Sequence, residues 1–139
     1  MDPRINIVSL GVTDPERALK FYREGLGWRP EVEMGDFVLF TLAGGLCLAL
    51  YPRKLLAEDA KVKDPGGFAG VTLAQNQPSE KRVDEVIAQA LAAGGTLLKK
   101  AQKAEWGGYS GYVADPDGHP WEIAWNPHFT LNADGLLSF

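Results

Sequence analysis

Apolar residues recur along this chain with two periods, and both halves use the periods in the same order. The first half opens with Arg4–Val12, an apolar and β-branched stretch that predicts a strand. Asp14 and Pro15 then form a helix start, because Asp caps a helix and Pro lacks an N–H that the first turn does not need. Apolar residues at helical spacing follow over Leu19–Leu26, so we expect an amphipathic helix there.

Three short strands are expected after this helix. Their predicted bounds are Arg29–Met34, Phe37–Leu42 and Leu46–Tyr51. Glycine-containing turns separate them, at Gly35-Asp36 and at Gly44-Gly45, and both are hairpin signals. The next stretch, Pro52–Gly67, is charged and ends in two glycines. We interpret it as a linker with one helical turn near Leu55–Ala60.

The second half repeats this plan. Phe68–Gln75 is predicted as a strand, and Ser79 is expected to cap a helix. The apolar stripe of this helix consists of Val83, Val86, Ile87, Ala90 and Leu91. The remaining strands are predicted at Thr96–Lys103, Ser110–Ala114 and Pro120–Trp125. Asp117-Gly118 forms the last hairpin turn.

The chain is therefore interpreted as one domain, residues 1–139, built by duplication of a βαβββ unit. The two modules are residues 1–51 and 68–126, with a linker at 52–67 and a tail at 127–139. In each module the helix covers one face of the sheet. The uncovered faces are expected to join into a curved, half-open mixed-sheet barrel of the α+β class that encloses a ligand cleft. The apolar tail is expected to fold back or to reach a partner subunit.

Composition narrows the classes of function. The formal net charge of −4 argues against a general role in binding nucleic acids or anionic membranes. Cys47 is the single cysteine, so no disulfide can form within the chain. No signal peptide and no apolar run of membrane-spanning length is visible, so we expect a cytoplasmic protein.

Two motifs resemble one known family. VTDPERALKFYREGLG, at residues 12–27, resembles the opening of the vicinal oxygen chelate superfamily, which contains glyoxalases, bleomycin-resistance proteins and extradiol dioxygenases. DPDGHPWEIAW, at residues 115–125, resembles the last hairpin of that superfamily, where a carboxylate follows the turn. The block from Trp106 to Pro127 is similar to a large bacterial branch of it. The resemblance implies the fold and a cleft, but no single reaction, because this scaffold hosts several chemistries.

The resemblance also implies four ligand positions for a divalent metal ion. They fall on Ile7, on one residue of Ala69–Val71, on Ala49 and on Glu122. Only Glu122 can donate a lone pair, and one carboxylate does not hold a catalytic transition metal. We therefore predict a site without a metal or other cofactor. This prediction disfavours glyoxalase I chemistry and extradiol ring cleavage, which use a metal to polarise vicinal oxygens.

The two histidines, His119 and His128, lie at none of these positions. One is next to the last predicted turn and the other lies beyond the last strand, where a lone histidine is usually exposed. Either one could approach a ligand position in a dimer. No Ser-His-Asp or Cys-His arrangement is visible.

Glu122 is the candidate catalytic residue. Its neighbours Trp121, Ile123 and Trp125 are expected to pack against the second helix, so Glu122 on the other strand face points into the cleft. There it can serve as a general base or as a hydrogen-bond acceptor for a ligand. The alternative is a structural carboxylate that pairs with an arginine or a backbone N–H, and both interpretations stay open.

Aromatic and amide residues complete the predicted site. Trp106 and Tyr109 flank two glycines in a loop, which favours either a flexible rim over a flat ligand or a tight turn. The other candidate ligand-binding residues are Phe37, Tyr51, Tyr112 and Asn76. Phe37, Tyr51 and Tyr112 are expected to line the cleft, but a shift of one residue in a strand would turn each side chain to the other face. Asn76 is either a pocket residue or a turn residue before Pro78.

The resulting hypothesis is a metal-independent protein that binds a small planar or aromatic molecule. The alternative is a lyase or isomerase of the same superfamily that uses Glu122 as a base or as its sole retained metal ligand. A non-catalytic interaction module is a third class, which the apolar tail would fit. Two chains commonly pair in the resembled superfamily and complete each other's clefts, so we expect a homodimer with two-fold symmetry.

Overall fold

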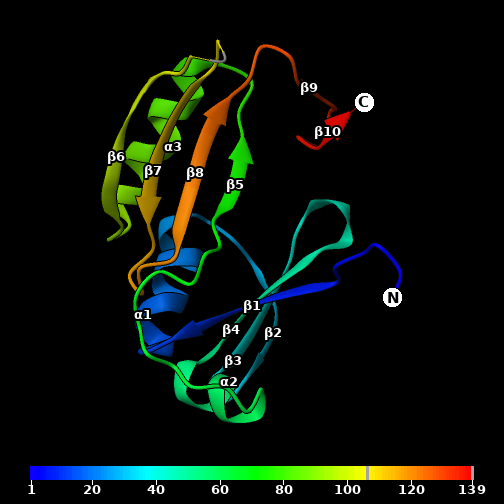
Figure 1. Ribbon diagram of the computed structural model, residues 1–139, viewed down its shortest axis with the longest axis vertical. Coiled ribbons are helices and arrows are strands. Elements are labelled where there is room, and N and C mark those ends of the chain that lie inside the picture. Colours follow the sequence, from blue (N-terminus) through cyan, green and yellow to red (C-terminus); the bar gives the residue numbers. More distant parts are fainter. Residues whose placement is uncertain (106, 139) are drawn as a thin grey trace.

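The computed structural model describes residues 1–105 and 107–138 and contains two four-stranded mixed sheets, each with a helix on one face (Figure 1). The first half consists of β1 (Ile7–Val12), α1 (Pro15–Lys20), the π-helical turn η1 (Phe21–Gly25), β2 (Pro30–Met34), β3 (Phe37–Thr41), the 3-10 turn η2 (Ala43–Gly45), β4 (Cys47–Pro52) and α2 (Arg53–Asp59). The second half consists of β5 (Leu73–Asn76), α3 (Glu80–Ala92), β6 (Thr96–Lys103), β7 (Tyr109–Ala114), β8 (Pro120–Trp125), β9 (Thr130–Leu131) and β10 (Leu137–Ser138).

The two sheets have the same topology. Their strand orders are β1-β4-β3-β2 and β5-β8-β7-β6. In each sheet the first strand pairs in parallel with the last, and the other neighbours are antiparallel. This repeated order confirms the predicted duplication of a βαβββ unit and the α+β class. Among the described residues, these two four-stranded sheets stay open and do not close into a barrel.

Both helix starts have the predicted caps. The side chain of Asp14 accepts a hydrogen bond from the backbone N–H of Arg17 at 3.0 Å, and Pro15 opens α1. The side chain of Ser79 accepts from the N–H of Arg82 at 3.3 Å at the start of α3. These bonds satisfy N–H groups that have no partner inside the helix.

The stripe of α3 faces the second sheet with one exception. Val83, Ile87 and Ala90 are buried, whereas Leu91, predicted on the same stripe, is 36% exposed. Helical rotation turns position 91 away from the sheet, because it lies one residue past the buried Ala90.

Several predicted elements have different bounds in the structure, and the first strand begins at Ile7 rather than at Arg4. The strand expected at Phe68–Gln75 is shorter, because only Leu73–Asn76 pairs with β8. Residues before it leave the extended conformation, and Gly70 has a positive φ of 75°. The linker contains more helix than expected, since α2 spans Arg53–Asp59 rather than one turn near Leu55–Ala60.

A single core joins the two modules through their helix-covered faces. Its buried members come from both halves: Leu10, Val12, Ala18, Phe21, Tyr22, Val38, Phe40, Leu48, Leu50, Val83, Ile87, Ala90, Val113 and Ile123. The contact between modules is close, since a methyl group added to Gly25 would lie 2.1 Å from Cβ of Ala93. The faces of the sheets that carry no helix are consequently left outside this core.

The C-terminal tail folds back toward the first sheet (Figure 1). Residues of β9 and β10 pair as a short antiparallel hairpin. Leu136 reaches the turn between β3 and β4. If Gly44 in that turn carried a Cβ atom, this atom would lie 3.4 Å from Cδ1 of Leu136. The tail was expected either to fold back or to reach a partner subunit, and in this structure it folds back on its own chain. None of the described helices has the length and apolar character to cross a membrane.

Candidate functional site

Glu122 lies in the middle of β8 on the sheet face that carries no helix. Its register partners are Tyr112 on β7 and Ala74 on β5. Trp121 and Ile123, the alternate residues, pack on the core, as the alternation predicted. The side chain of Glu122 is half-buried among these neighbours.

Tyr112 is electrostatically coupled to this carboxylate. The pKa of Tyr112 is raised above its ordinary value, first by burial of the hydroxyl and then by the negative charge of Glu122 and a hydrogen bond to it. The ammonium group of Lys99 lies 5.9 Å from the centroid of the Tyr112 ring, within cation–π range. Glu122, Tyr112 and Lys99 therefore form one polar group on the uncovered face of the second sheet.

Three of the predicted site residues lie elsewhere. Tyr109 is on the opposite face of β7, where its hydroxyl donates to Asp84 of α3 at 3.0 Å, so it does not accompany Glu122. Phe37 and Tyr51 belong to the first sheet, with ring centroids 6.0 Å apart at an angle of 73°. Trp106 lies outside the described residues.

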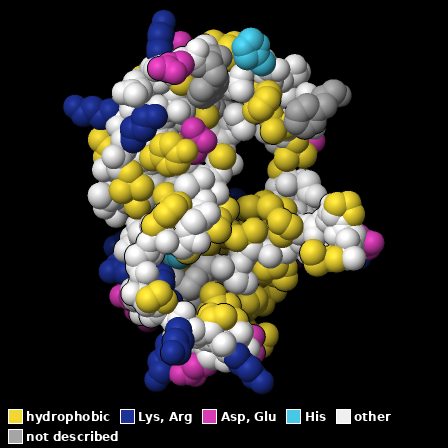
Figure 2. Space-filling model, in the orientation of Figure 1, with side chains coloured by type: hydrophobic (Ala, Val, Ile, Leu, Met, Phe, Trp, Pro, Cys, Tyr) yellow, Lys and Arg dark blue, Asp and Glu magenta, His cyan; other side chains and the backbone are white. Residues whose placement is uncertain are grey.

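One cavity lies between the two sheets and beneath the C-terminal tail. Its volume is about 850 Å³, and Figure 2 shows a hollow between the two lobes of the molecule. Trp28, Phe40 and Trp121 line it, and Trp28 lies 5.8 Å from Phe40 and 5.9 Å from Trp121 between ring centroids.

The predicted residue Asn76 lines the same cavity, together with Gln75 and Gln77. Ala74 also belongs to its wall and is the register partner of Glu122. Glu122, Tyr112 and Lys99 are not themselves lining residues of this cavity.

The side chains at the implied metal positions do not fit a divalent ion. Ile7 and Ala49 are hydrocarbon side chains, and neither can replace a lost histidine or carboxylate. Across residues 1–105 and 107–138, no group of three or more His, Cys, Asp and Glu could hold a metal ion. The described residues therefore place no set of three such donors around Glu122.

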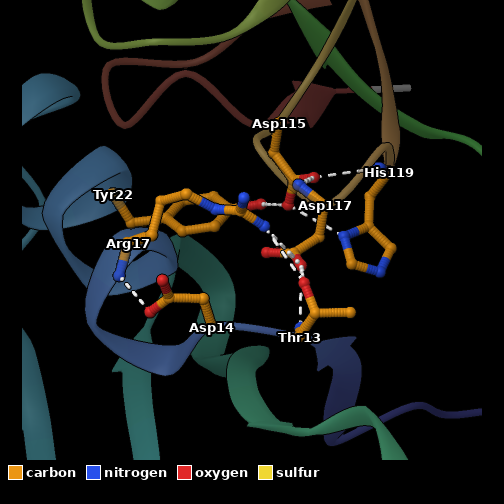
Figure 3. Close-up of polar contacts among 7 residues, drawn as sticks. All are labelled: Thr13, Asp14, Arg17, Tyr22, Asp115, Asp117 and His119. Carbon is orange, nitrogen blue, oxygen red and sulfur yellow. Dashed lines mark hydrogen bonds and ion pairs between the residues drawn. The ribbon is translucent and has the colours of Figure 1, made fainter.

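A second polar cluster, centred on Asp115, joins the two modules (Figure 3). Asp115 is only 2% exposed. One of its oxygens accepts from the hydroxyl of Tyr22 and faces Nδ1 of His119, each at 2.8 Å. The other accepts from the backbone N–H groups of Asp117 and His119, at 3.0 and 2.9 Å.

Asp117 makes a parallel connection from the β7–β8 turn to the start of α1. Its Oδ1 accepts from the N–H of Thr13 at 2.8 Å, from the Thr13 hydroxyl at 2.6 Å and from Arg17 at 3.1 Å. Its other oxygen, Oδ2, is buried and has no hydrogen-bond partner among the described residues.

This cluster was not predicted from the sequence. Asp117-Gly118 was interpreted only as a turn, and Tyr22 only as part of an apolar stripe. The signal was present in the Asp-Pro-Asp-Gly-His segment, where two carboxylates and a histidine occur within five residues. His119 was expected to be exposed, but its side chain is 19% exposed and bound to Asp115. Tertiary contacts with Tyr22 and Thr13 created this environment.

The family model of the Glyoxalase/Bleomycin resistance protein/Dioxygenase superfamily matches residues 4–123. The chain belongs to this superfamily, which confirms the resemblance of its two motifs. Comparison with curated proteins finds no match.

Solved structures agree with this assignment. A glyoxalase-related enzyme from Fulvimarina pelagi is 37% identical, has a TM-score of 0.88, and the match covers 99% of this chain and 98% of that chain. Protein ATC0852 from Agrobacterium tumefaciens is 32% identical, with a TM-score of 0.70 and coverage of 88% and 96%. A lactoylglutathione lyase from the same species is 21% identical, with a TM-score of 0.67 and coverage of 90% and 95%, and shows the fold alone.

Replacement of Tyr22 by Phe tests the Asp115 cluster. Loss of a buried hydrogen-bond donor to a carboxylate should lower the free energy of unfolding by about 1–3 kcal/mol at neutral pH. Tyr109→Phe is the matched control, because it removes an exposed Tyr–Asp hydrogen bond and should cost less. Urea unfolding of both variants measures the difference, and equal losses would contradict the importance of the cluster.

When the protein is titrated with acid, Tyr22→Phe should begin to unfold at a higher pH than the wild type. Burial alone would raise the pKa of Asp115, but the hydrogen bonds and charge from His119 and the hydrogen bond from Tyr22 lower it below its ordinary value. The stability that this carboxylate contributes is present above its unfolded pKa of about 3.9 and is lost as the pH falls through the lower folded pKa. Without the Tyr22 donor the folded pKa rises, so this loss begins at higher pH. Acid titrations followed by circular dichroism test this shift.

Proposed function

We propose that this protein binds a small planar or aromatic molecule, without a metal ion, at the cavity between its sheets. The observation that carries the proposal is the composition of the cavity wall. Trp28 and Trp121 supply flat apolar surface with the buried Phe40 behind them, and Asn76 and its neighbouring glutamines supply hydrogen-bonding groups. Its volume of about 850 Å³ lies in the range of small-molecule sites.

Glu122 is the proposed polar anchor of this ligand. Glu122 does not itself line the cavity, but its register partner Ala74 on β5 does. A negative charge at that position favours a ligand that carries a positive charge or hydrogen-bond donors. The hydroxyl of Tyr112 holds Glu122 from the other side.

Benzamidine and benzoate form a matched pair of probes for this site, because both are flat and differ in the sign of charge. Benzamidine should raise the thermal midpoint and benzoate should not, since a ligand of the native state stabilises it. Glu122→Gln should weaken benzamidine binding by about tenfold, the effect of losing one charge-assisted hydrogen bond. Glu33→Gln, an exposed carboxylate on β2, is the control variant. Equal binding of the two probes would contradict the anchor.

A homodimer is proposed to complete the cleft. The uncovered face of the first sheet presents apolar side chains to solvent, with Ile7 51% exposed and Phe37, Leu39 and Tyr51 half-buried. The uncovered face of the second sheet carries Glu122 and Tyr112. Pairing of two chains by a two-fold axis would bury the first face of each protomer against the second face of its partner.

Leu39→Glu tests this arrangement, because it places a charge in the middle of the uncovered first face. We expect the wild type to sediment as a dimer and the variant as a folded monomer. Leu91→Glu, on the outer side of α3, should remain dimeric. Sedimentation velocity with circular dichroism distinguishes dissociation from unfolding, and a monomeric wild type would overturn the dimer.

A lyase or isomerase that uses Glu122 as a base is the second candidate function. The contact of Glu122 with the Tyr112 hydroxyl favours it, because a carboxylate beside a hydroxyl can pass a proton to or from a bound substrate. If Glu122 acts this way, a panel of carbonyl compounds in D2O should show exchange of the α-proton with the wild type, followed by NMR. Glu122→Gln should lose about 100-fold or more of the rate. Unchanged exchange in this variant, with Glu33→Gln as control, would remove the role.

A further inference from the structure

A second cavity lies at the seam between the modules. Its volume is about 470 Å³, and its walls come from the edge of β1, from α2, from the segment leading to β5, and from the β7–β8 turn. Its apolar lining consists mainly of Val8, Leu10, Leu56, Val62, Phe68 and Val71. Neither Glu122 nor Asn76 lines it, so it is separate from the proposed aromatic site.

His119 forms the polar end of this cavity. Its Nδ1 lies 2.8 Å from an oxygen of Asp115, whose pKa is lowered, so the carboxylate is ionised at neutral pH and accepts the proton on Nδ1. In the neutral tautomer that donates from Nδ1 to Asp115, the other ring nitrogen, Nε2, carries a free lone pair and can accept a hydrogen bond. Figure 3 shows the far edge of the ring turned away from the carboxylates.

The ring is held in this orientation before any ligand arrives. Three donors other than the histidine ring fix Asp115: the Tyr22 hydroxyl and the backbone N–H groups of Asp117 and His119. With its side chain 19% exposed, His119 also has little freedom to rotate. A preoriented acceptor at the end of an apolar cavity costs less entropy to engage than a mobile one.

A second acceptor belongs to the same wall. Asp117 lines the cavity, its side chain is 1% exposed, and its Oδ2 has no partner among the described residues. A buried carboxylate oxygen without a donor costs free energy that a ligand donor or a water would recover. Both polar groups at this end therefore call for a hydrogen-bond donor.

The charges and apolar surface define the body of the ligand. The cavity is lined by two cationic residues, Arg53 and Lys63, and by two anionic residues, Asp64 and Asp117. Arg53 and Asp64 already pair with each other, since Nη2 of Arg53 donates to Asp64 at 2.7 Å. A neutral ligand fits this balance. Phe68 and Val62 are 74% and 61% exposed at the cavity, a large apolar exposure that a hydrocarbon ligand would cover.

We propose that this seam cavity is a second ligand site, in which Nε2 of His119 accepts a hydrogen bond from the hydroxyl of a neutral phenol-type molecule. The ring of the ligand lies against the apolar wall, and its hydroxyl lies at the His119 end. The site uses the Asp115 cluster as its support and is independent of Glu122.

The test uses phenol, with toluene as a probe of the same shape that lacks the donor. The chain has two histidines, so protein labelled with ¹⁵N-histidine gives only the ring signals of His119 and His128. Saturating phenol should shift Nε2 of His119 and leave the exposed His128 unmoved, and toluene should leave the Nε2 signal near its free position. If phenol shifted the ring signals of His119 and His128 equally, or left the signal of His119 unchanged, the proposed site would be wrong.

Two variants separate the hydrogen bond from the cavity. His119→Ala should weaken phenol binding by about tenfold while toluene binding changes little. Ala57→Phe fills the cavity from α2 without touching the Asp115 cluster, so it should abolish the phenol shift while the His119 signal itself persists. Phenol binding of wild-type strength in Ala57→Phe would place the ligand elsewhere and contradict the proposal.

Discussion

The burial of the Asp115 charge is the constraint on which the arrangement of the two modules depends. An ionised carboxylate in the interior is tolerated only when donors surround it. Those donors come from both halves of the chain: Tyr22 from the turn after α1, and His119 with two backbone N–H groups from the β7–β8 turn. Asp117 adds a second link to Thr13. The modules cannot slide relative to each other without breaking these bonds.

This fixed orientation decides which surfaces remain for function. The helix-covered faces meet in one core, where Gly25 and Ala93 approach closely, and the uncovered faces stay outside it. The polar group around Glu122 lies on one uncovered face, while the aromatic cavity and the seam cavity lie where the modules diverge. In this member of the superfamily, hydrocarbon side chains occupy two of the implied metal positions, Ile7 and Ala49.

Local physics explains why much of the fold could be predicted. Capping by Asp14 and Ser79, the stripe of α3 and the alternation along β8 are properties of short segments, and the structure confirms each. The site was predicted less well. Glu122 and Tyr112 lie together because the β7–β8 pairing has a fixed register, but Tyr109 lies on the other face, since the alternation places residues 109 and 112 on opposite sides.

The sequence by itself determined the two βαβββ modules, the capped starts of α1 and α3 and the position of Glu122 on the helix-free face, because periodicity and capping act within a few residues. Only the tertiary structure decided what Asp115, His119 and Tyr22 do. Tyr22 and Asp115 are 93 residues apart in the chain, and no local pattern encodes a contact over that separation. A turn motif and an amphipathic helix become a buried hydrogen-bond cluster only when the two modules pack.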